Sequence, residues 1–342
     1  MLNVGIIGAG RIGKVHCESI MRYVKSATVK AIADPFLNDE TKEWAKGLGV
    51  NEFYTDYHKI LEDKDIQAVL ICSSTDTHST ISLEAIAAGK HIFCEKPIDH
   101  DVNKILEVKK ALENSNVKYQ VGFNRRFDHN FKAARKAVEG GQIGDLNILK
   151  VCSRDPGAPP VSYIKVSGGI FLDMTIHDFD MVRFMSGSEV EEVFAYGAVL
   201  VDPAIGEAGD IDTAVISMKL ANGAIAVIDN CRRASYGYDQ RVEAFGSLGQ
   251  VAISNDSEST AVPTLTAFTV RFRLTSSLRD TWELTLRRFL SSLTVLLTTS
   301  RSLSALSAAS SPYLSALPQR SLLRQVCRLR LQTLRQNTVF NI

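Results

Sequence analysis

Gly8-Ala9-Gly10-Arg11-Ile12-Gly13 ends an apolar stretch, residues 3–8, and opens a segment with helical patterning. The first glycine of such a pattern permits a tight turn, the second lets the main chain approach a pyrophosphate, and the third lets helix and strand pack closely. Amide groups at the start of the helix favour phosphate charge. The stretch therefore predicts a strand, a phosphate-binding turn and a helix, the opening of a dinucleotide-binding fold.

An acidic residue supports this interpretation. Asp34 ends the next predicted strand, 24 residues after Gly10. A carboxylate there binds the hydroxyls of the adenosine ribose and repels a 2′-phosphate, so we expect NAD rather than NADP. A glycine turn without a ligand is the ordinary alternative, but strand, turn, helix and acid occur together here. The predicted cofactor-binding residues of this part are Gly8, Gly10, Arg11, Ile12, Gly13 and Asp34.

The first part of the chain alternates short apolar runs with segments of helical patterning. This alternation is typical of a parallel sheet with helices on both faces. The predicted strands are residues 3–8, 29–34, 68–72, 91–94 and 119–123, and the predicted helices are residues 13–23, 41–48, 78–88 and 102–113. We expect an α/β domain over residues 1–122, with a doubly wound parallel sheet.

The patterning changes from about residue 145. Longer strands are predicted at residues 148–152, 190–200, 213–220, 224–231 and 242–245. Asn222-Gly223 predicts a tight hairpin between two of them. Residues 173–185 form the one strong predicted helix. We therefore expect a second domain built on an antiparallel sheet, over residues 123–262.

The composition changes abruptly after residue 262. The last of the 22 glycines is Gly249, and residues 263–342 contain 18 leucines and eleven arginines, with a net charge of +9 against −8 for residues 1–262. An Arg-rich tail that binds nucleic acid is one interpretation. However, basic and aromatic residues are not interleaved in it, and leucine is too abundant for simple disorder. We favour a shifted reading frame, and expect neither a native domain there nor a nucleic-acid partner.

Composition excludes several classes of protein. The chain has 342 residues, of which 45% are hydrophobic and 23% charged, as in an ordinary globular protein of about two domains. No apolar run approaches the roughly 20 residues of a membrane-spanning helix, and the first residues lack a signal-peptide pattern. The six cysteines show neither CxxC nor metal-finger spacing. We expect a cytoplasmic protein without a membrane partner, disulfide framework or structural zinc.

Two further stretches follow predicted strands, at the edge where ligands bind in parallel sheets. The first is Cys72-Ser73-Ser74-Thr75-Asp76-Thr77-His78, whose small hydroxyl side chains can line a cofactor groove. A plain helix N-cap at Asp76 or Thr77 explains this stretch equally well. The predicted cofactor-binding residues are Ser73, Thr75 and His78 in this stretch and Glu95 in the second one.

The second of these stretches is Glu95-Lys96-Pro97. Most lysines are solvated surface charges. A lysine between a strand end and a proline has limited freedom, however, and at this edge its ammonium could steady a developing alkoxide.

A third group lies in residues 168–180, GGIFLDMTIHDFD, which place Asp173 and His177 four residues apart and so on one helix face. A neutral histidine can take a hydroxyl proton near neutral pH. An N-cap role for Asp173 and a structural role for His177 explain the spacing about as well. A metal pair is conceivable, but no third ligand is evident and Lys96 would oppose a cation, so we expect no metal.

The motifs at Gly8–Gly13, Glu95-Lys96-Pro97 and residues 169–180 occur in this order in the glucose–fructose oxidoreductase/inositol dehydrogenase (Gfo/Idh/MocA) family. The chain resembles this family over residues 1–262. Within it, Asn124-Arg125-Arg126-Phe127-Asp128, Ser153-Arg154-Asp155-Pro156 and Tyr236-Gly237-Tyr238-Asp239-Gln240 look like the bacterial myo-inositol 2-dehydrogenases. Residues 263–342 match none of the strand and helical return with which members usually finish.

This resemblance implies a Rossmann domain followed by an α+β domain with an open, mostly antiparallel sheet, through whose exposed face members usually form homotetramers. It implies a catalytic set of Lys96, Asp173 and His177. It also implies that a small polyol substrate lies near Arg125, Asp155 and Tyr236.

The reaction we expect is NAD-dependent oxidation of myo-inositol to its 2-keto product, scyllo-inosose. His177 would accept the hydroxyl proton, Lys96 would hydrogen-bond the same oxygen, and Asp173 would orient His177 or a neighbouring hydroxyl. The nearest alternatives are scyllo-inositol, D-chiro-inositol or glucose as substrate. A sensor that binds NAD without catalysis is a different class, but it should have lost one of the three catalytic residues, and all are present.

Overall fold

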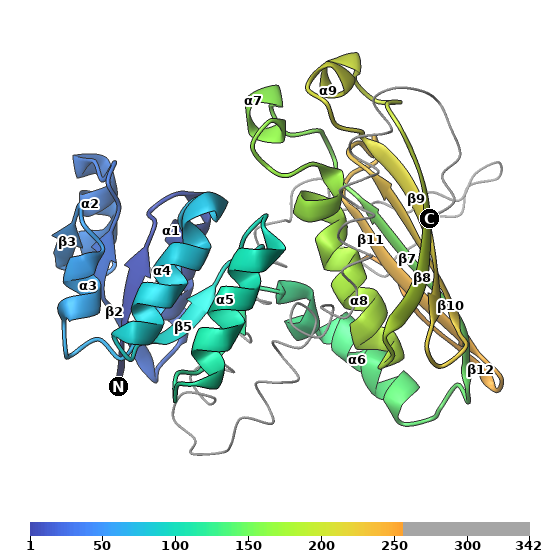
Figure 1. Ribbon diagram of the computed structural model, residues 1–342, viewed down its shortest axis with the longest axis horizontal. Helices are drawn as coiled ribbons and strands as arrows, with labels where there is room; N and C mark the ends of the chain where they lie inside the picture. The colour runs from blue at the N-terminus through green and yellow to red at the C-terminus, as the bar shows by residue number, and fades with distance from the viewer. Residues whose placement is uncertain (256–342) are drawn as a thin grey trace, which may run out of the picture. The chain divides into compact units, whose positions relative to one another are not determined.

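The computed structural model describes residues 1–255, which form two compact units, Met1–Phe127 and 128–255, each with its own sheet (Figure 1). The predictions for residues 263–342 lie outside the described residues. Within residues 1–255, no helix combines the length and apolar character needed to cross a membrane.

The first unit is a six-stranded sheet in which all neighbouring strands are parallel, in the order β3-β2-β1-β4-β5-β6. Its strands are β1 (Leu2–Ile7), β2 (Ala27–Ala33), β3 (Glu52–Tyr54), β4 (Ala68–Ile71), β5 (His91–Cys94) and β6 (Tyr119–Val121). Its helices are α1 (Arg11–Tyr23), α2 (Asp39–Gly47), α3 (His58–Glu62), α4 (Thr75–Ala87), α5 (Val102–Glu113) and the short 3₁₀ helix η1 (Asn124–Phe127). This strand order is that of dinucleotide-binding folds, and the predicted doubly wound sheet is confirmed.

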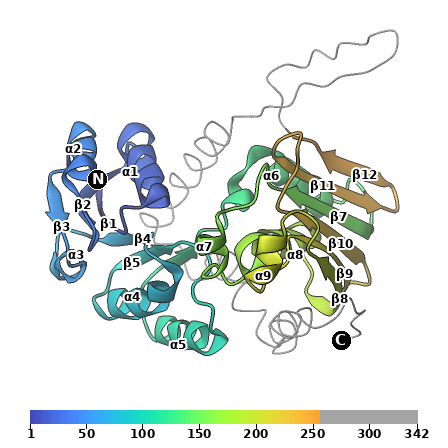
Figure 2. The same ribbon diagram turned by 90° about the horizontal axis from the view of Figure 1, so that it is seen from above.

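Both faces of this sheet are covered by helices. Figure 2 shows α1 and α2 on one side of the strands and α4 and α5 on the other. All four residues of β4 are buried, as expected for a strand packed on both faces. The short edge strand β3 and helix α3 were not predicted, because three half-buried residues carry no readable period.

The second unit is a mixed six-stranded sheet in the order β12-β11-β7-β10-β9-β8, antiparallel except for the parallel pair β7 and β10. Its strands are β7 (Leu146–Arg154), β8 (Val190–Ala198), β9 (Thr213–Leu220), β10 (Ile225–Cys231), β11 (Asp239–Gly246) and β12 (Gly249–Ile253). The predicted hairpin at Asn222-Gly223 joins β9 to β10. Its loop has three residues, 221–223: the Gly223 amide donates to the Leu220 carbonyl at 2.9 Å, and Gly223 has the positive φ of +87° that the last residue of such a loop requires. The mostly antiparallel sheet is confirmed.

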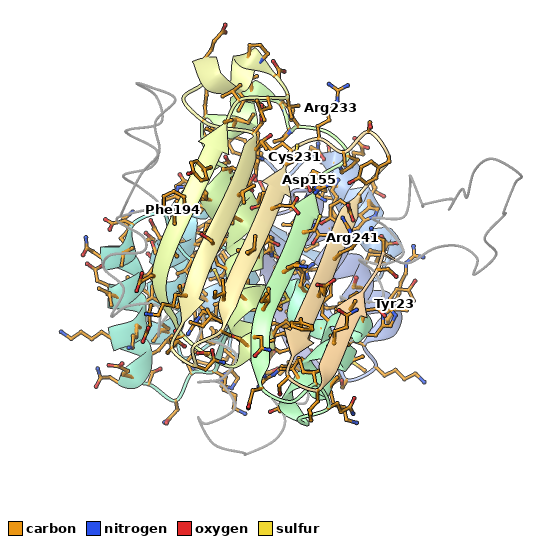
Figure 3. All side chains as sticks on the ribbon, turned by 90° about the vertical axis from the view of Figure 1, so that its right-hand side faces the viewer. Tyr23, Asp155, Phe194, Cys231, Arg233 and Arg241 are labelled. Atoms are coloured by element: carbon orange, nitrogen blue, oxygen red, sulfur yellow. The ribbon has the colours of Figure 1, made fainter. Side chains whose placement is uncertain are left out.

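Helices cover one face of this second sheet and leave the other open. Helices α6 (His129–Glu139) and α8 (Ile176–Ser186) lie on the same side of the strands (Figures 1 and 2). Strand β9 shows the resulting alternation, since Ile216 and Met218 are buried in the core while Val215 is 47% exposed. Figure 3 looks onto the open face, where Phe194 and Arg241 are labelled. Helix α6 was not predicted.

The predicted helix at residues 173–185 is two elements. A single π-helical turn, η2 (Phe171–Thr175), precedes α8, and short helices α7 (Val161–Ile164) and α9 (Pro203–Glu207) lie in the connections around them. Such π-turns are frequent at functional sites.

Candidate active site

The glycine turn of the first unit has the close contacts that its three glycines predict. Gly8 has a φ of +101°, and a Cβ there would lie 2.5 Å from the carbonyl carbon of Cys72. A Cβ on Gly13 would lie 2.0 Å from the carbonyl oxygen of Gly8, whereas a Cβ on Gly10 would meet nothing within 4 Å. The first and third glycines thus serve packing, and the second leaves open space beside the main chain. Arg11 and Ile12 begin α1 directly after this space.

Asp34 lies immediately after β2 and is tied to the glycine turn. The amide of Ala9 donates to Asp34 Oδ2 at 2.7 Å, and the amide of Phe36 donates to Oδ1 at 2.8 Å. Both carboxylate oxygens retain lone pairs after these bonds, because each oxygen can accept more than one hydrogen bond. This arrangement suits the acid that holds ribose hydroxyls.

The loops after β4 and β5 complete this edge of the sheet. Ser74 is the N-cap of α4, so neither Asp76 nor Thr77 has the capping role considered above. Thr75 is the first residue of α4, and the Ser73 hydroxyl lies 2.7 Å from that of Thr77. The main chain of Ser73 also touches Gly8, since a Cβ on Gly8 would lie 2.5 Å from the Ser73 nitrogen.

Two buried histidines fasten these loops. The His78 ring is 2% exposed, with Nδ1 2.8 Å from the Pro97 carbonyl oxygen and Nε2 3.0 Å from that of Ser73. His16, on α1, is fully buried, and its Nε2 lies 2.7 Å from Glu95 Oε1. The Glu95 side chain therefore contacts helix α1 through His16. The His78 ring is buried beneath the loops and is not on their surface. Lys96, directly after Glu95, is half-buried.

The π-turn of the second unit is shaped by the paired glycines that precede it. Gly168 and Gly169 have φ of +87° and +85°. A Cβ on Gly169 would lie 2.8 Å from Asp210 Oδ1, which accepts a hydrogen bond from the Ile170 amide at 3.1 Å. The glycines therefore let the chain approach the Asp210 carboxylate.

Asp173 is held within this turn by two side chains. The Tyr163 hydroxyl donates to Asp173 Oδ1 at 2.8 Å, and Arg232 Nη1 donates to Oδ2 at 3.2 Å. Arg232 is 1% exposed, and its Nη2 also donates to Asp210 at 3.4 Å. The N-caps of η2 and α8 are Ile170 and Thr175, so Asp173 caps neither element.

His177 lies in the first turn of α8, and a second buried network fixes this junction. Asn230 of β10 is 1% exposed, and its amide donates to Asp178 Oδ2 at 2.8 Å. Its oxygen accepts from the Thr175 hydroxyl at 2.5 Å. One strand residue therefore binds the π-turn and the α-helix on either side of His177.

The three predicted substrate residues lie in different places. Arg125 is in η1 of the first unit. Asp155 follows β7, and its amide donates to the Cys231 carbonyl at 3.0 Å. Figure 3 shows the two residues next to each other at one end of the sheet.

The Tyr236 hydroxyl is engaged on the open face. It accepts from Arg154 Nη1 and donates to Asp239 Oδ2, both at 2.8 Å. Burial would raise the pKa of the Asp239 carboxyl, but hydrogen bonds from Arg241, Asn255 and Tyr236 hold that pKa well below its usual range. Asp173 and His177 belong instead to the helices of the other face.

Four residues that hold the predicted site residues or their elements were not predicted: His16, Tyr163, Asn230 and Arg232. Of these, Asn230 carried a signal, because a polar residue at a core-facing position of an otherwise apolar strand has to find a buried partner. The others meet partners far away in sequence, such as Arg232 and Asp173, which are 59 positions apart. Among residues 1–255, no group of three His, Cys, Asp or Glu side chains could hold a metal ion.

Comparisons with known proteins agree for both units. Residues 2–123 match an oxidoreductase family with an NAD-binding Rossmann fold, and residues 131–252 match the GFO/IDH/MocA C-terminal domain. The myo-inositol 2-dehydrogenase of Thermotoga maritima is 51% identical over 266 residues, which cover 77% of this chain and 78% of that protein. The inositol 2-dehydrogenase of Rhizobium meliloti is 49% identical over 252 residues, 73% of this chain and 75% of that protein.

A solved structure gives the same result for the fold. The scyllo-inositol dehydrogenase of Lactobacillus casei, crystallised with NAD(H) and scyllo-inositol, aligns with a TM-score of 0.83 and 28% identity. The alignment covers 93% of this chain and 95% of that one.

Proposed function

The chain belongs to the GFO/IDH/MocA family of NAD-binding oxidoreductases, and from this premise we propose that it oxidises myo-inositol to scyllo-inosose. The observation that supports a polyol most directly is Asp173, a carboxylate fixed between Tyr163 and Arg232 one helical turn before His177. A polyol is selected by fixed hydrogen-bonding groups rather than by an apolar pocket. The inositol dehydrogenases named above support the choice of ring.

The residues of the first unit fit NAD. The open space at Gly10 lets a pyrophosphate reach the start of α1, and the Asp34 carboxylate is placed for ribose hydroxyls. NAD, when bound, supplies a hydride acceptor for the carbon that carries the reacting hydroxyl.

The remaining steps fall to the chain's own side chains. His177 accepts the proton of the reacting hydroxyl as a neutral base. Lys96 donates a hydrogen bond to the same oxygen and offsets the negative charge that develops there. Asp173 orients the hydroxyl beside it or the His177 ring. Asp155 and Arg125 hold other hydroxyls, and Tyr236 remains the third predicted contact.

The test is NADH formation by the purified full chain with myo-inositol, scyllo-inositol, D-chiro-inositol and glucose, each with NAD and with NADP. We expect the largest kcat/KM with myo-inositol and NAD. A clear preference for another polyol would correct the substrate. No turnover of any of them, together with unimpaired NAD binding, would favour a sensor instead.

We propose that the open face of the second sheet mediates the homotetramer that the family resemblance implies. Its strands expose large apolar side chains between cross-strand ion pairs such as Lys150–Glu243. Exposed apolar groups in one patch mark interaction surfaces. These apolar side chains are Ile148, Tyr196, Val215, Ile225 and Phe245.

Sedimentation velocity tests this assembly. Ile225→Glu is expected to shift the tetramer to smaller species, whereas Phe36→Glu, at a 90% exposed position of the first unit, should leave it intact. A wild-type monomer would contradict the assembly.

A further inference from the structure

His78 lies in the first turns of α4, buried beneath the cofactor edge of the first sheet. Both of its ring nitrogens are within hydrogen-bond distance of main-chain carbonyl oxygens, Pro97 at 2.8 Å and Ser73 at 3.0 Å. The Cys94 thiol also interacts with the ring, but its hydrogen is donated to the Glu95 carbonyl oxygen at 3.3 Å. The ring therefore faces two groups that can only accept.

The chemistry of the imidazole ring decides its charge. A neutral ring carries one N–H and one lone pair, whereas the protonated ring carries two N–H donors. In a neutral His78 the nitrogen without a proton would face one of the two carbonyl oxygens, and two hydrogen-bond acceptors would repel each other. Only the imidazolium satisfies both contacts, and hydrogen bonds from a charged donor are about twice as strong as neutral ones.

The surroundings of the ring agree with this assignment. Burial lowers the pKa of His78, but its interaction with Cys94 at the end of β5 and its hydrogen bonds to Pro97 and Ser73 outweigh burial and raise that pKa to about 9. His16, the other buried histidine of this edge, differs. One of its ring nitrogens lies 2.7 Å from the Glu95 carboxylate, and neither is within hydrogen-bond distance of two main-chain carbonyls.

The two carbonyls belong to loops that bear on catalysis. Ser73 lies in the loop whose main chain packs against Gly8 of the glycine turn. Pro97 directly follows Lys96. A ring that holds both carbonyls therefore fixes the main chain beside Lys96 relative to the glycine turn.

We propose that His78 is a positioning residue that remains doubly protonated at neutral pH and clamps the Ser73 and Pro97 carbonyls, thereby fixing Lys96. The same unit uses another buried cation in this way: Lys90 Nζ donates to the carbonyls of Asp63 at 2.5 Å and Ile66 at 2.7 Å. The role of Lys96 rests on the proposed function, but the charge and contacts of His78 do not.

The protonation state can be observed directly. Joint X-ray and neutron diffraction from crystals of the wild-type chain at neutral pH should show deuterium on both Nδ1 and Nε2 of His78. Density on only one nitrogen would overturn the proposal. This measurement needs neither turnover nor a variant, so it separates failure of the clamp from failure of the proposed function.

Kinetics test the effect on Lys96. His78→Gln keeps one amide donor and turns its oxygen toward the second carbonyl, so kcat should fall about tenfold or more, because small misplacements of a catalytic group are costly. The KM for myo-inositol and the Kd for NAD should stay within about threefold. If His78→Gln only unfolded part of the protein, the fraction of active enzyme and the melting temperature would both fall.

Two further variants complete the series. His78→Lys restores a buried cation with several donors, as at Lys90, and should recover part of the lost kcat. His58→Gln, at an exposed histidine of the same unit, is the matched control and should match wild type. Equal kcat for His78→Gln and His58→Gln would overturn the positioning role even if the neutron result held.

Discussion

The two units hold their functional groups by different means. In the first, the glycine turn, the loop after β4 and the loop after β5 are joined mainly through main-chain atoms, namely the Gly8 contact with Cys72 and Ser73 and the two carbonyls bound by His78. In the second, Asp173 and the start of α8 are held by side chains, with Arg232 and Asn230 as the buried centres. A cofactor shared by many enzymes needs a generic main-chain cradle, whereas a particular polyol needs particular side chains.

This difference has an energetic side. Main-chain hydrogen bonds survive most substitutions, because every residue except proline carries the same donor and acceptor. Gly8 and Gly13, where a Cβ would clash, are the exceptions in this unit. A buried charged network fails when one member is removed, since the remaining charges are left uncompensated. The second unit should therefore be the more sensitive of the two to single substitutions beside its functional residues.

Lys96→Met should have the largest effect, because it removes a proposed functional side chain itself rather than one of the contacts that hold it. The substitution keeps the length of the side chain but removes the charge that offsets the alkoxide, so we expect kcat to fall about 1,000-fold. The Kd for NAD, measured by fluorescence titration, should barely change, because the glycine turn and Asp34 are untouched. A rate near wild type would contradict the role of Lys96.

Arg232→Met makes the equivalent test in the second unit. Loss of this buried cation leaves Asp173 and Asp210 uncompensated, and we expect the free energy of unfolding to fall by about 3 kcal/mol. Urea denaturation measures the change. Arg233→Met, at the exposed neighbouring position, is the control and should stay within about 0.5 kcal/mol of wild type. Equal stability of the two variants would remove the contrast between the units.

The pH dependence of stability probes His78, the proposed cationic clamp of the first unit. The pKa of His78 is raised in the folded chain from 6.5 to about 9, so its contribution is complete below about pH 6.5 and is lost as pH rises through about 9. We expect a loss on the order of 2 kcal/mol across this range relative to His78→Gln. If the free energy of unfolding of wild type and of His78→Gln changed with pH in the same way, the raised pKa of His78 would be contradicted.

Asp34→Ala should have the smallest effect. The substitution removes the proposed ribose contacts and one hydrogen bond to the glycine turn, so the Kd for NAD should rise about tenfold, or about 1.4 kcal/mol. The preference for NAD over NADP should become smaller, because the repulsion between the carboxylate and the 2′-phosphate is lost. Asp39→Ala, at a highly exposed acid of the same unit, is the control.

The contrast between the units also explains what could be predicted from the sequence. Glycine spacing and apolar runs encode main-chain geometry locally, so the parallel sheet, the turn and Asp34 were predicted with the bounds of most strands. The Asn222-Gly223 hairpin was predictable for the same reason. The short edge strand β3 was missed because it lacks a period.

The side-chain networks could not be predicted in the same way. Arg232 gives no local signal that it meets Asp173, and the spacing of Asp173 and His177 reads as one α-helix although a π-turn precedes α8. Both facts depend on packing between segments distant in sequence. The predicted roles of Arg125, Asp155 and Tyr236 stay predictions.

The single parallel strand pair of the second sheet has an evolutionary consequence. Because β7 and β10 run in the same direction, the segments that leave them start side by side, with Asp155 bonded to Cys231 and Ala234. The segment between β7 and η2 is thus held at its start by the pairing of β7 with β10. It is held at its end by the close approach of Gly169 to Asp210. Insertions or replacements between those anchors can alter the groups offered to a ligand while the sheet keeps its register, so new specificities can arise in this unit without a new fold.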